Sequence, residues 1–529
     1  MKKSKRERKS EAVEVSRRSF MQRAGTGLVA GAFVGGLPTS VALGQSRSWD
    51  QEVDVLVLGS GAAGTAAALA AAQSGSRVLV LERAPNQGGS SRRSGGVLYL
   101  GGGTPPQVAN GFDDTPDNMY NYLVRAMGVG ADEARIRAYS DGSVDLYNWL
   151  VDVGLPFNNK YNEHKITITE DDTTLYWSGS ERSYPYTEYA TPVPRGHKTG
   201  VQGGSTGYAL MDVLYEAAEQ AGVEFRFNTR AVDLIEDGDR VVGVVAQDTE
   251  NGSEQRFGAR GGVVVTTGGF QFNQDLVALH CPQYINTAAP LGAPEEDGDG
   301  LTMGQRIGAQ VVNLDRGSPW KFIYPPDAMV KSLLVSPLGT RFITEDIYGG
   351  NSSDMTMRHY DGISYLIYDE AIRQEIGDHA ERLNPIAQAD TVAGLAEQLN
   401  VPVSALENTV DFYNQHAGDG EDPLFHKKSD YVQPLSSPPY YALDFSGPSG
   451  MAWITLGGLR IDPNGRVMNV DGEVIPGLYA AGRAGAALGG IYNSGTSLGD
   501  CVFFGREAGR QAASESPTAS HRRQVASKL

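Results

Sequence analysis

Three glycines with a fixed spacing, Gly59, Gly61 and Gly64, form the pattern G-x-G-x-x-G. Glycine at these positions permits a tight turn, lets the backbone approach a pyrophosphate, and lets a helix pack closely on a strand. Glu82 follows at the separation where a carboxylate hydrogen-bonds an unphosphorylated adenosine ribose. These residues therefore predict the binding of a dinucleotide such as FAD or NAD.

The elements around these glycines are those that a dinucleotide site requires. The residues from Val53 to Leu58 form a short apolar, β-branched run that is typical of a buried parallel strand. An Ala-rich helical stretch continues to about Gln73, and the residues from Arg77 to Glu82 indicate a second strand. Because the helix begins at the glycines, its free N–H groups and positive dipole end would face the phosphates. A chance match to the glycine pattern does not explain all of these elements together.

Further glycine-rich segments favour FAD over NAD. Gly88–Ser91 and Ser94–Gly96 follow the acid, and Ile475–Arg483 lies far along the chain. These segments resemble those that run along the pyrophosphate, flavin and ribityl chain in the flavoprotein superfamily of fumarate reductase and succinate dehydrogenase. An ordinary buried strand and turn is the alternative for the last segment. The resemblance also implies a helix that begins near Leu498 and directs its N-terminus at the flavin.

The motifs and the resemblance together imply non-covalent FAD and one set of binding residues. The expected FAD-binding residues are Gly59, Gly61, Ala62, Ala63, Gly64, Glu82, Arg83, Gly88, Gly89, Ser90, Ser91, Ser94, Gly95, Gly96, Gly268, Gly482, Arg483, Ser497 and Leu498.

The resemblance implies an α/β fold with a discontinuous Rossmann-type FAD-binding domain and an inserted α+β substrate-capping domain. Residues 50–275 and 444–515 would form the two parts of the FAD-binding domain. Residues 276–443 would form the cap, because β-α alternation becomes less regular after residue 275. We expect the active site in the cleft between the cap and the flavin.

Parts of the chain outside the motifs carry weaker patterns. Helical spacing predicts helices over Pro116–Met127, Asp132–Asp152 and Tyr208–Ala221, and Val223–Asn228 is strand-like. The Tyr-rich stretch Tyr176–Tyr189 could line a pocket, although packing is the favoured interpretation.

Two positions separate this chain from enzymes that reduce fumarate-like acids. Those enzymes resemble one another in a His before a Gly pair and in an Arg of a second glycine-rich motif, which clamp carboxylates. This chain has Thr455 and Tyr492 at these places. The segment Gly489–Asp500 instead resembles the 3-ketosteroid Δ4-(5α)-dehydrogenase branch, as does Gly339–Tyr348 with its R-F-x-x-E-D motif.

Desaturation beside a ketone removes a proton from the α-carbon and transfers a hydride to flavin N5. The ketone oxygen needs hydrogen-bond donors during this reaction. The resemblance implies that Tyr492 and Ser494 form the proton-abstracting pair, with Tyr348 supporting proton transfer or orienting the substrate. A tyrosine serves as base or donor if neighbours lower its pKa, and the sequence leaves these roles open between the two tyrosines. Packing tyrosines with hydrogen-bonded hydroxyls are the alternative.

Two arginines are further candidates. An Arg in the cap of related reductases can act as an acid, and Arg341 and Arg358 are possible counterparts. The setting of Arg341 in R-F-x-x-E is also common for a structural ion pair, which is the favoured interpretation.

Three functions fit these patterns, and only the third belongs to a different class. The first is a dehydrogenase acting on a bulky, apolar cyclic ketone of the 3-ketosteroid type. The second is a reductase that saturates an activated C=C bond in an unsaturated acid or ketone. The third is a flavin-binding electron carrier without its own substrate, which would have no use for Tyr492 and Ser494 beside the flavin. The enzymes would need an external electron acceptor or donor.

Length, charge and cysteine content restrict the partners. A chain of 529 residues exceeds what one hydrophobic core organises, so two domains are expected. A formal net charge of −18 argues against nucleic acid as a partner. The two cysteines, Cys281 and Cys501, have no metal-ligand spacing, so we expect free thiols, no metal site and no iron–sulfur cluster.

The N-terminus resembles a twin-arginine export signal. A basic start leads to Ser16–Met21 with its paired arginines, then to the apolar stretch Ala24–Leu43. We expect residues 1–44 to be a signal peptide and the protein to be exported to the periplasm or another extracytoplasmic space. An uncleaved membrane anchor is the alternative, and no later segment is predicted to span a membrane. Residues 516–529 are polar and predict a tail.

Overall fold

The computed structural model describes residues 48–516. The predicted export signal and all but the first residue of the predicted tail lie outside the described residues. One mostly parallel sheet organises the site-bearing part of the chain, in the strand order β20-β21-β10-β1-β2-β7. Its strands are β1 (Gln51–Leu58), β2 (Val78–Leu81), β7 (Glu224–Arg226), β8 (Thr229–Asp237), β9 (Arg240–Asp248), β10 (Glu254–Val265), β20 (Arg466–Met468) and β21 (Val474–Ala480).

This sheet is assembled from two distant parts of the chain. Strand β21 pairs in parallel with β10, with Val263 opposite Leu478, so a C-terminal strand completes a sheet begun at residue 51. All four residues of β2 and the last six of β1 are buried, which explains their continuous apolar sequence. The expected α/β fold with a discontinuous Rossmann-type domain is therefore confirmed.

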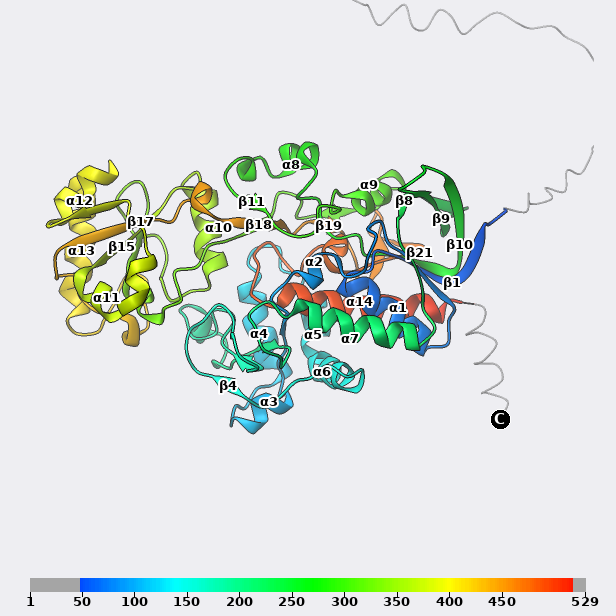
Figure 1. Ribbon diagram of the computed structural model, residues 1–529, viewed down its shortest axis with the longest axis horizontal. Helices are drawn as coiled ribbons and strands as arrows, with labels where there is room; N and C mark the ends of the chain where they lie inside the picture. The colour runs from blue at the N-terminus through cyan, green and yellow to red at the C-terminus, as the bar shows by residue number, and fades with distance from the viewer. Residues whose placement is uncertain (1–47, 517–529) are drawn as a thin grey trace, which may run out of the picture. The chain divides into compact units, whose positions relative to one another are not determined.

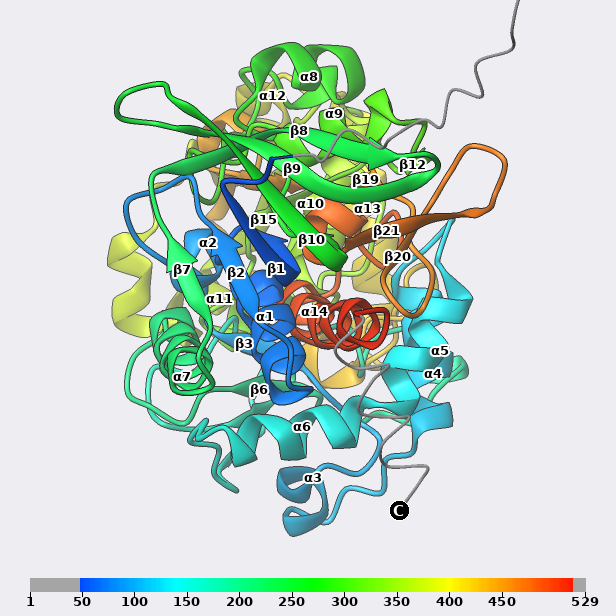
Figure 2. The same cartoon turned by 90° about the vertical axis from the view of Figure 1, so that its right-hand side faces the viewer.

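Two helices pack together along the sheet. Helix α1 (Ala62–Gln73) and helix α14 (Thr496–Ser514) lie side by side, with α7 (Gly207–Gln220) beside them, as Figure 2 shows. A Cβ on Gly505 would lie 2.3 Å from the backbone oxygen of Ala63, and one on Gly509 would lie 2.1 Å from that of Ala67. Glycines in α14 thus permit the close approach that brings its N-terminus to the glycine loop.

The predicted helices of the less readable region exist with one correction. Helix α4 spans Pro116–Ala126, but the expected continuous helix over Asp132–Asp152 is two helices, α5 (Glu133–Asp141) and α6 (Ser143–Asp152). The break falls at Gly142, where a Cβ would lie 2.5 Å from the Phe503 ring of α14. Packing against α14, which no local pattern reveals, therefore interrupts the helical stretch.

Smaller sheets occupy the middle of the chain. Strands β14 (Leu333–Val335), β15 (Tyr365–Asp369), β16 (Ala387–Ala389) and β17 (Tyr440–Asp444) form a four-stranded antiparallel sheet that carries α12 (Val392–Leu399) and α13 (Val403–Ala417), at the left of Figure 1. A second sheet orders β11 (Ala289–Pro290), β18 (Ala452–Thr455) and β13 (Gly317–Trp320). The exact limits of the cap, residues 276–443, stay a prediction.

Three further findings concern residues 48–516. No helix there is long and apolar enough to cross a membrane. No group of three or more His, Cys, Asp or Glu side chains is placed to hold a metal ion. Cys281 and Cys501 are both free thiols.

Candidate active site

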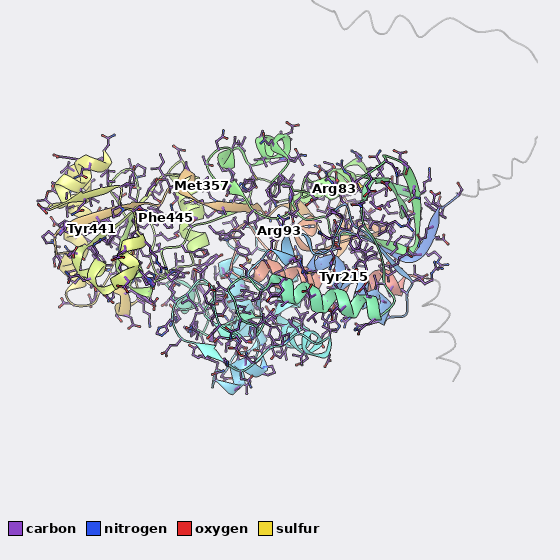
Figure 3. The ribbon with its side chains drawn as sticks, viewed as in Figure 1. Arg83, Arg93, Tyr215, Met357, Tyr441 and Phe445 are labelled. Carbon is purple, nitrogen blue, oxygen red and sulfur yellow. The ribbon has the colours of Figure 1, made fainter. Side chains whose placement is uncertain are left out.

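A cavity of about 540 Å³ lies where the glycine loop, the end of β2, β13 and the N-terminus of α14 meet. Arg83 and Arg93, which both line it, mark its surroundings in Figure 3. Gly64 and Gly88 are the only predicted FAD-binding residues that do not line it. The predicted residues that do are Gly59, Gly61, Ala62, Ala63, Glu82, Arg83, Gly89, Ser90, Ser91, Ser94, Gly95, Gly96, Gly268, Gly482, Arg483, Ser497 and Leu498.

The glycines of the loop have different surroundings. Gly59 has a φ of +104°, and a Cβ there would lie 2.7 Å from the backbone oxygen of Thr266. A Cβ on Gly64 would lie 1.9 Å from the backbone oxygen of Gly59, so Gly64 serves helix packing. A Cβ on Gly61 would meet nothing closer than Ser91 Oγ, at 3.5 Å, and would extend into the cavity. The space beside Gly61 therefore fits a pyrophosphate that approaches the backbone closely.

Glu82 is fixed at the end of β2. Its Oε2 accepts hydrogen bonds from the Ser60 backbone N–H at 2.8 Å and from Ser60 Oγ at 2.7 Å. Its Oε1 accepts one from the Ala84 backbone N–H at 2.8 Å. Each carboxylate oxygen offers about two acceptor positions, so Oε1 retains capacity for a ribose hydroxyl facing the cavity.

A buried polar network that sequence reasoning missed borders the cavity on another side. Glu296 pairs with Arg483 and accepts a 2.7 Å hydrogen bond from Ser90 Oγ. Gln271 connects this pair to Thr455, whose Oγ1 donates to Gln271 Oε1 at 3.1 Å and accepts from the Phe270 backbone N–H at 3.2 Å. Thr455, at the place of the reductase His, thus has structural partners and does not line the cavity. No motif signals Glu296 or Gln271.

Tyr492 lines the cavity in the turn that precedes α14. Its hydroxyl oxygen accepts a hydrogen bond of 3.2 Å from the Gly495 backbone N–H, where a φ of +84° turns the chain into the helix. Burial raises the pKa of Tyr492 to about 12, although hydrogen bonds from the backbone N–H groups of Gly495 and Ser497 oppose the rise. These two hydrogen bonds lower the pKa of Tyr492, as expected, but burial raises it by more. The side chain is therefore a neutral phenol near pH 7.

The other two predicted catalytic residues lie beside Tyr492. The Tyr348 and Tyr492 rings are 6.1 Å apart between centroids. Burial raises the pKa of Tyr348 well above its ordinary value, and a side-chain hydrogen bond with Ser494 opposes this rise. The three residues therefore come together from two distant segments. The Ser494 hydroxyl is paired with Tyr348, whereas backbone N–H groups bind the hydroxyl of Tyr492.

One loop holds both segments in place. Ser180 Oγ accepts a 3.0 Å hydrogen bond from the Tyr348 backbone N–H, and Ser178 Oγ donates to the Ser494 backbone oxygen at 3.4 Å. Nearby, Ser183 Oγ donates to the Asp346 backbone oxygen at 2.6 Å. The Tyr-rich stretch, expected to pack, thus also supports the site.

Trp320 is a cavity residue that the sequence analysis missed. It comes from β13, and its ring meets that of Tyr492 edge to face at 5.4 Å between centroids. Its Nε1 is buried and has no hydrogen-bond partner among residues 48–516. A buried N–H without a partner costs free energy, so an acceptor on a bound molecule would satisfy this donor. A lone Trp followed by an unremarkable loop gives no sequence signal.

The two candidate arginines have structural partners. Arg341 is 8% exposed and binds both Glu345 and Asp422 through paired hydrogen bonds of 2.7–3.0 Å. Arg358 donates to Asp354 at 2.7 Å and to the Gly490 backbone oxygen at 3.2 Å. Neither lines the cavity, and the ion-pair interpretation of Arg341 fits these contacts.

Comparisons with known proteins agree with this geometry. The family model described as "FAD binding domain" matches residues 54–498. The solved structure of a 3-ketosteroid-Δ4-(5α)-dehydrogenase from Rhodococcus jostii RHA1, in complex with 4-androstene-3,17-dione, is 43% identical with a TM-score of 0.82, over 89% of this chain and 98% of that one. A 3-oxosteroid 1-dehydrogenase of Mycobacterium tuberculosis is 27% identical, over 86% of this chain and 97% of the relative. A probable fumarate reductase of Shewanella frigidimarina is 28% identical, over 90% and 76%.

Proposed function

Because the chain belongs to the FAD binding domain family, we propose that it is an FAD-dependent dehydrogenase that desaturates a C–C bond beside the ketone of a 3-ketosteroid-like substrate. Its membership of the FAD-dependent oxidoreductases follows from the family and from relatives that act on CH–CH groups. The 43% identity to an enzyme that acts on 3-ketosteroids, over 98% of that enzyme, supports the substrate class.

The glycine loop and its surroundings fit FAD. The backbone beside Gly61 is open to the cavity, and Glu82 offers a fixed acceptor for the adenosine ribose. Ser497 and Leu498, in the first turn of α14, also line the cavity and would present the helix N-terminus to a bound flavin ring. When bound, FAD supplies the hydride acceptor at N5. Among residues 48–516 no histidine lines the cavity, which supports non-covalent binding.

The protein's own residues handle the proton and the ketone. We assign Tyr492 the acceptance of the proton from the substrate α-carbon, because its hydroxyl lines the cavity and backbone N–H groups bind its oxygen. Ser494, which also lines the cavity, shares a hydrogen bond with Tyr348, and we assign this pair the support of proton transfer. The unpartnered N–H of Trp320 is placed to donate to the substrate ketone as enolate charge develops.

The observation that carries this proposal is that Tyr492 and Ser494 line the cofactor cavity and that Tyr348 lies beside both. To test it, the holoenzyme is incubated with a saturated 5α-3-ketosteroid and an artificial electron acceptor, and the product is identified by mass spectrometry. The proposal expects a 4-ene-3-ketosteroid lighter by H₂. Unchanged steroid, with fumarate reduced by the dithionite-treated enzyme, would favour the reductase alternative.

The reductase alternative is the weaker one because the carboxylate clamps are missing. Thr455 is engaged with Gln271 and the Phe270 N–H, and Tyr492 stands where the reductases have Arg. Neither of these two positions therefore carries a cationic side chain that could bind a dicarboxylate. An apolar ketone has no need of such clamps.

We also propose export by the twin-arginine route and an external electron acceptor. The order of basic, apolar and small residues in 1–44 supports the export signal. Replacement of Arg17 and Arg18 by lysine, followed by cell fractionation, tests it. Export expects the wild type in the extracytoplasmic fraction and the variant retained inside, whereas equal distributions would contradict the proposal.

A further inference from the structure

We propose that Tyr122 and Asn493 are positioning residues for the dehydrogenation. Their hydrogen bonds fix the turn Tyr492–Ser494 relative to Tyr348 and thereby set the rate of proton removal from the substrate. Neither residue lines the cofactor cavity, so neither is placed to touch the substrate or FAD. Both roles rest on the proposed function, because this alignment matters only where the catalytic side chains handle a proton.

The two catalytic segments are joined by one continuous series of hydrogen bonds. The Tyr348 backbone N–H donates to Ser180 Oγ at 3.0 Å, and the Ser180 backbone N–H donates to the hydroxyl oxygen of Tyr122, on α4, at 2.8 Å. The Tyr122 hydroxyl donates to Asn493 Oδ1 at 2.7 Å. Since Asn493 is the middle residue of the turn Tyr492–Ser494, the series runs from one catalytic segment to the other.

The chemistry of these groups fixes the direction of each bond. A backbone N–H can only donate, so the Tyr122 oxygen accepts from Ser180 and its single hydrogen is left for Asn493. The Asn493 amide accepts with Oδ1 and donates with Nδ2, which lies 3.3 Å from the Ser494 backbone oxygen. An apolar side chain at either position could not reproduce these bonds.

Burial makes the bonds strong constraints on position. Tyr122 is 1% exposed and Asn493 is 2% exposed, so losing one partner would leave the other buried and unpaired. A Cβ on Gly179 would lie 2.4 Å from Asn493 Oδ1 and 2.6 Å from the Tyr122 hydroxyl oxygen, so glycine is needed where these two groups meet. The Tyr122 ring also stacks on the Tyr99 ring, with 5.8 Å between centroids. Packing and hydrogen bonding therefore fix the Tyr122 hydroxyl in one place.

The turn before α14 is also held by bonds that do not involve Tyr122. The Tyr99 backbone N–H donates to the Gly495 backbone oxygen at 3.0 Å, and the Gly495 N–H donates to the Tyr492 hydroxyl at 3.2 Å. Loss of the Tyr122 hydroxyl should therefore leave the turn folded and loosen its alignment with the opposite segment.

Alignment of this kind affects the chemical step more than binding. A proton is transferred between groups within hydrogen-bond reach, and a small displacement of the acceptor slows the transfer strongly. Substrate binding depends on the walls of the cavity, to which Tyr122 and Asn493 do not contribute. The two residues should therefore influence the rate of flavin reduction and leave the affinity for the steroid almost unchanged.

Rapid-mixing measurements of flavin reduction by a saturated 3-ketosteroid, together with spectral titration by the product steroid, test this role. Tyr122→Phe is expected to keep its flavin and its dissociation constant for the product, and to reduce its flavin about 10- to 100-fold more slowly. Tyr441→Phe is the matched control, because it removes a buried hydroxyl that donates to Glu370 at 2.7 Å in the four-stranded sheet (Figure 3). The control is expected to keep the wild-type rate.

A double-variant cycle separates positioning from a general loss of stability. In Tyr348→Phe, the hydroxyl with which the turn is aligned is absent, so adding Tyr122→Phe should slow reduction much less than it slows the wild type. A general defect would slow both backgrounds by the same factor. Effects that multiply fully would therefore contradict the positioning role.

Asn493→Ala serves as the second variant, because it removes the acceptor of the Tyr122 hydroxyl from the other side. It is expected to slow reduction as Tyr122→Phe does, again with little change in steroid affinity. If both folded variants reduce their flavin at the wild-type rate, the positioning role is wrong while the dehydrogenase proposal stands. If no 3-ketosteroid reduces the wild type, the dehydrogenase proposal has failed, and the positioning role fails with it.

Discussion

The backbone N–H of Gly495 donates a hydrogen bond of 3.2 Å to the hydroxyl oxygen of Tyr492. The same N-terminus of α14 presents Ser497 and Leu498 to the cofactor cavity. One helix end therefore positions the proposed proton acceptor and lines the cavity proposed to hold the flavin, and its partial positive charge would favour anionic states of both. Proton and hydride removal are thereby arranged around a single structural element.

The glycine loop predicts different outcomes for two similar substitutions. Gly61→Ala is expected to fold normally and to lose FAD, because its Cβ meets no atom closer than 3.5 Å but enters the space assigned to the pyrophosphate. Gly64→Ala is expected to destabilise the fold itself, because its Cβ would lie 1.9 Å from the Gly59 oxygen. Flavin content and thermal unfolding of both purified variants measure this. A Gly61→Ala protein with full flavin content would contradict the assignment.

Trp320 is expected to contribute a hydrogen bond to the substrate. Trp320→Phe removes the unpartnered Nε1–H but keeps an aromatic ring against Tyr492, so substrate binding should weaken by about tenfold, the effect of about 1.4 kcal/mol. Spectral titration of the oxidised enzyme with a product ketosteroid measures the dissociation constant. A deoxy analogue without the ketone should bind both proteins equally, and an equal loss for it would assign Trp320 to packing.

Tyr348 and Ser494 are expected to act as a unit. Tyr348→Phe and Ser494→Ala each break their shared hydrogen bond, so each should slow flavin reduction by about 10- to 100-fold. The double variant should be slower by much less than the product of the single effects, because the second change removes nothing further from the pair. Rapid-mixing rates for the four proteins give the coupling. Strictly additive effects would show that the two hydroxyls work independently.

Arg341 is expected to serve stability. Arg341→Met leaves the buried carboxylates Glu345 and Asp422 short of partners, so the free energy of unfolding should fall by about 3–5 kcal/mol. Urea unfolding measures the loss, and Arg137→Met, at a more exposed ion pair with Asp141, is a control expected to lose less than about 1 kcal/mol. The folded fraction of Arg341→Met should reduce its flavin at the wild-type rate. A folded but inactive variant would make Arg341 part of the catalytic machinery.

The sequence predicts those features that local spacing encodes. The strand, glycine turn and helix around Gly59 follow from the order of residues, as does the acid that closes β2. Trp320 and Glu296 belong to no motif, and it is strand pairing and loop packing that bring them to the cavity. The break at Gly142 has the same origin in its contact with Phe503. Contacts between distant segments therefore limit what could be predicted.

The pairing of Ser494 shows the same limit within the site. The motif predicts that Tyr492 and Ser494 act together, and their spacing places them in one turn before α14. Which hydroxyl each one meets depends on Tyr348, which arrives from the segment before α10 (Gly349–His359) and is held by Ser180. The residue types could be predicted, but their partners could not.

Anaerobic bleaching of the bound flavin by a panel of saturated 3-ketosteroids, in the wild type and in Tyr492→Phe, tests the central claim most directly. The account predicts bleaching of the wild type, and loss of bleaching in a variant that keeps its full flavin content, since general-base catalysis contributes about 10²–10⁴-fold. Failure of every steroid to bleach the wild type, with reoxidation of its dithionite-reduced flavin by unsaturated acids, would contradict the account and favour a reductase.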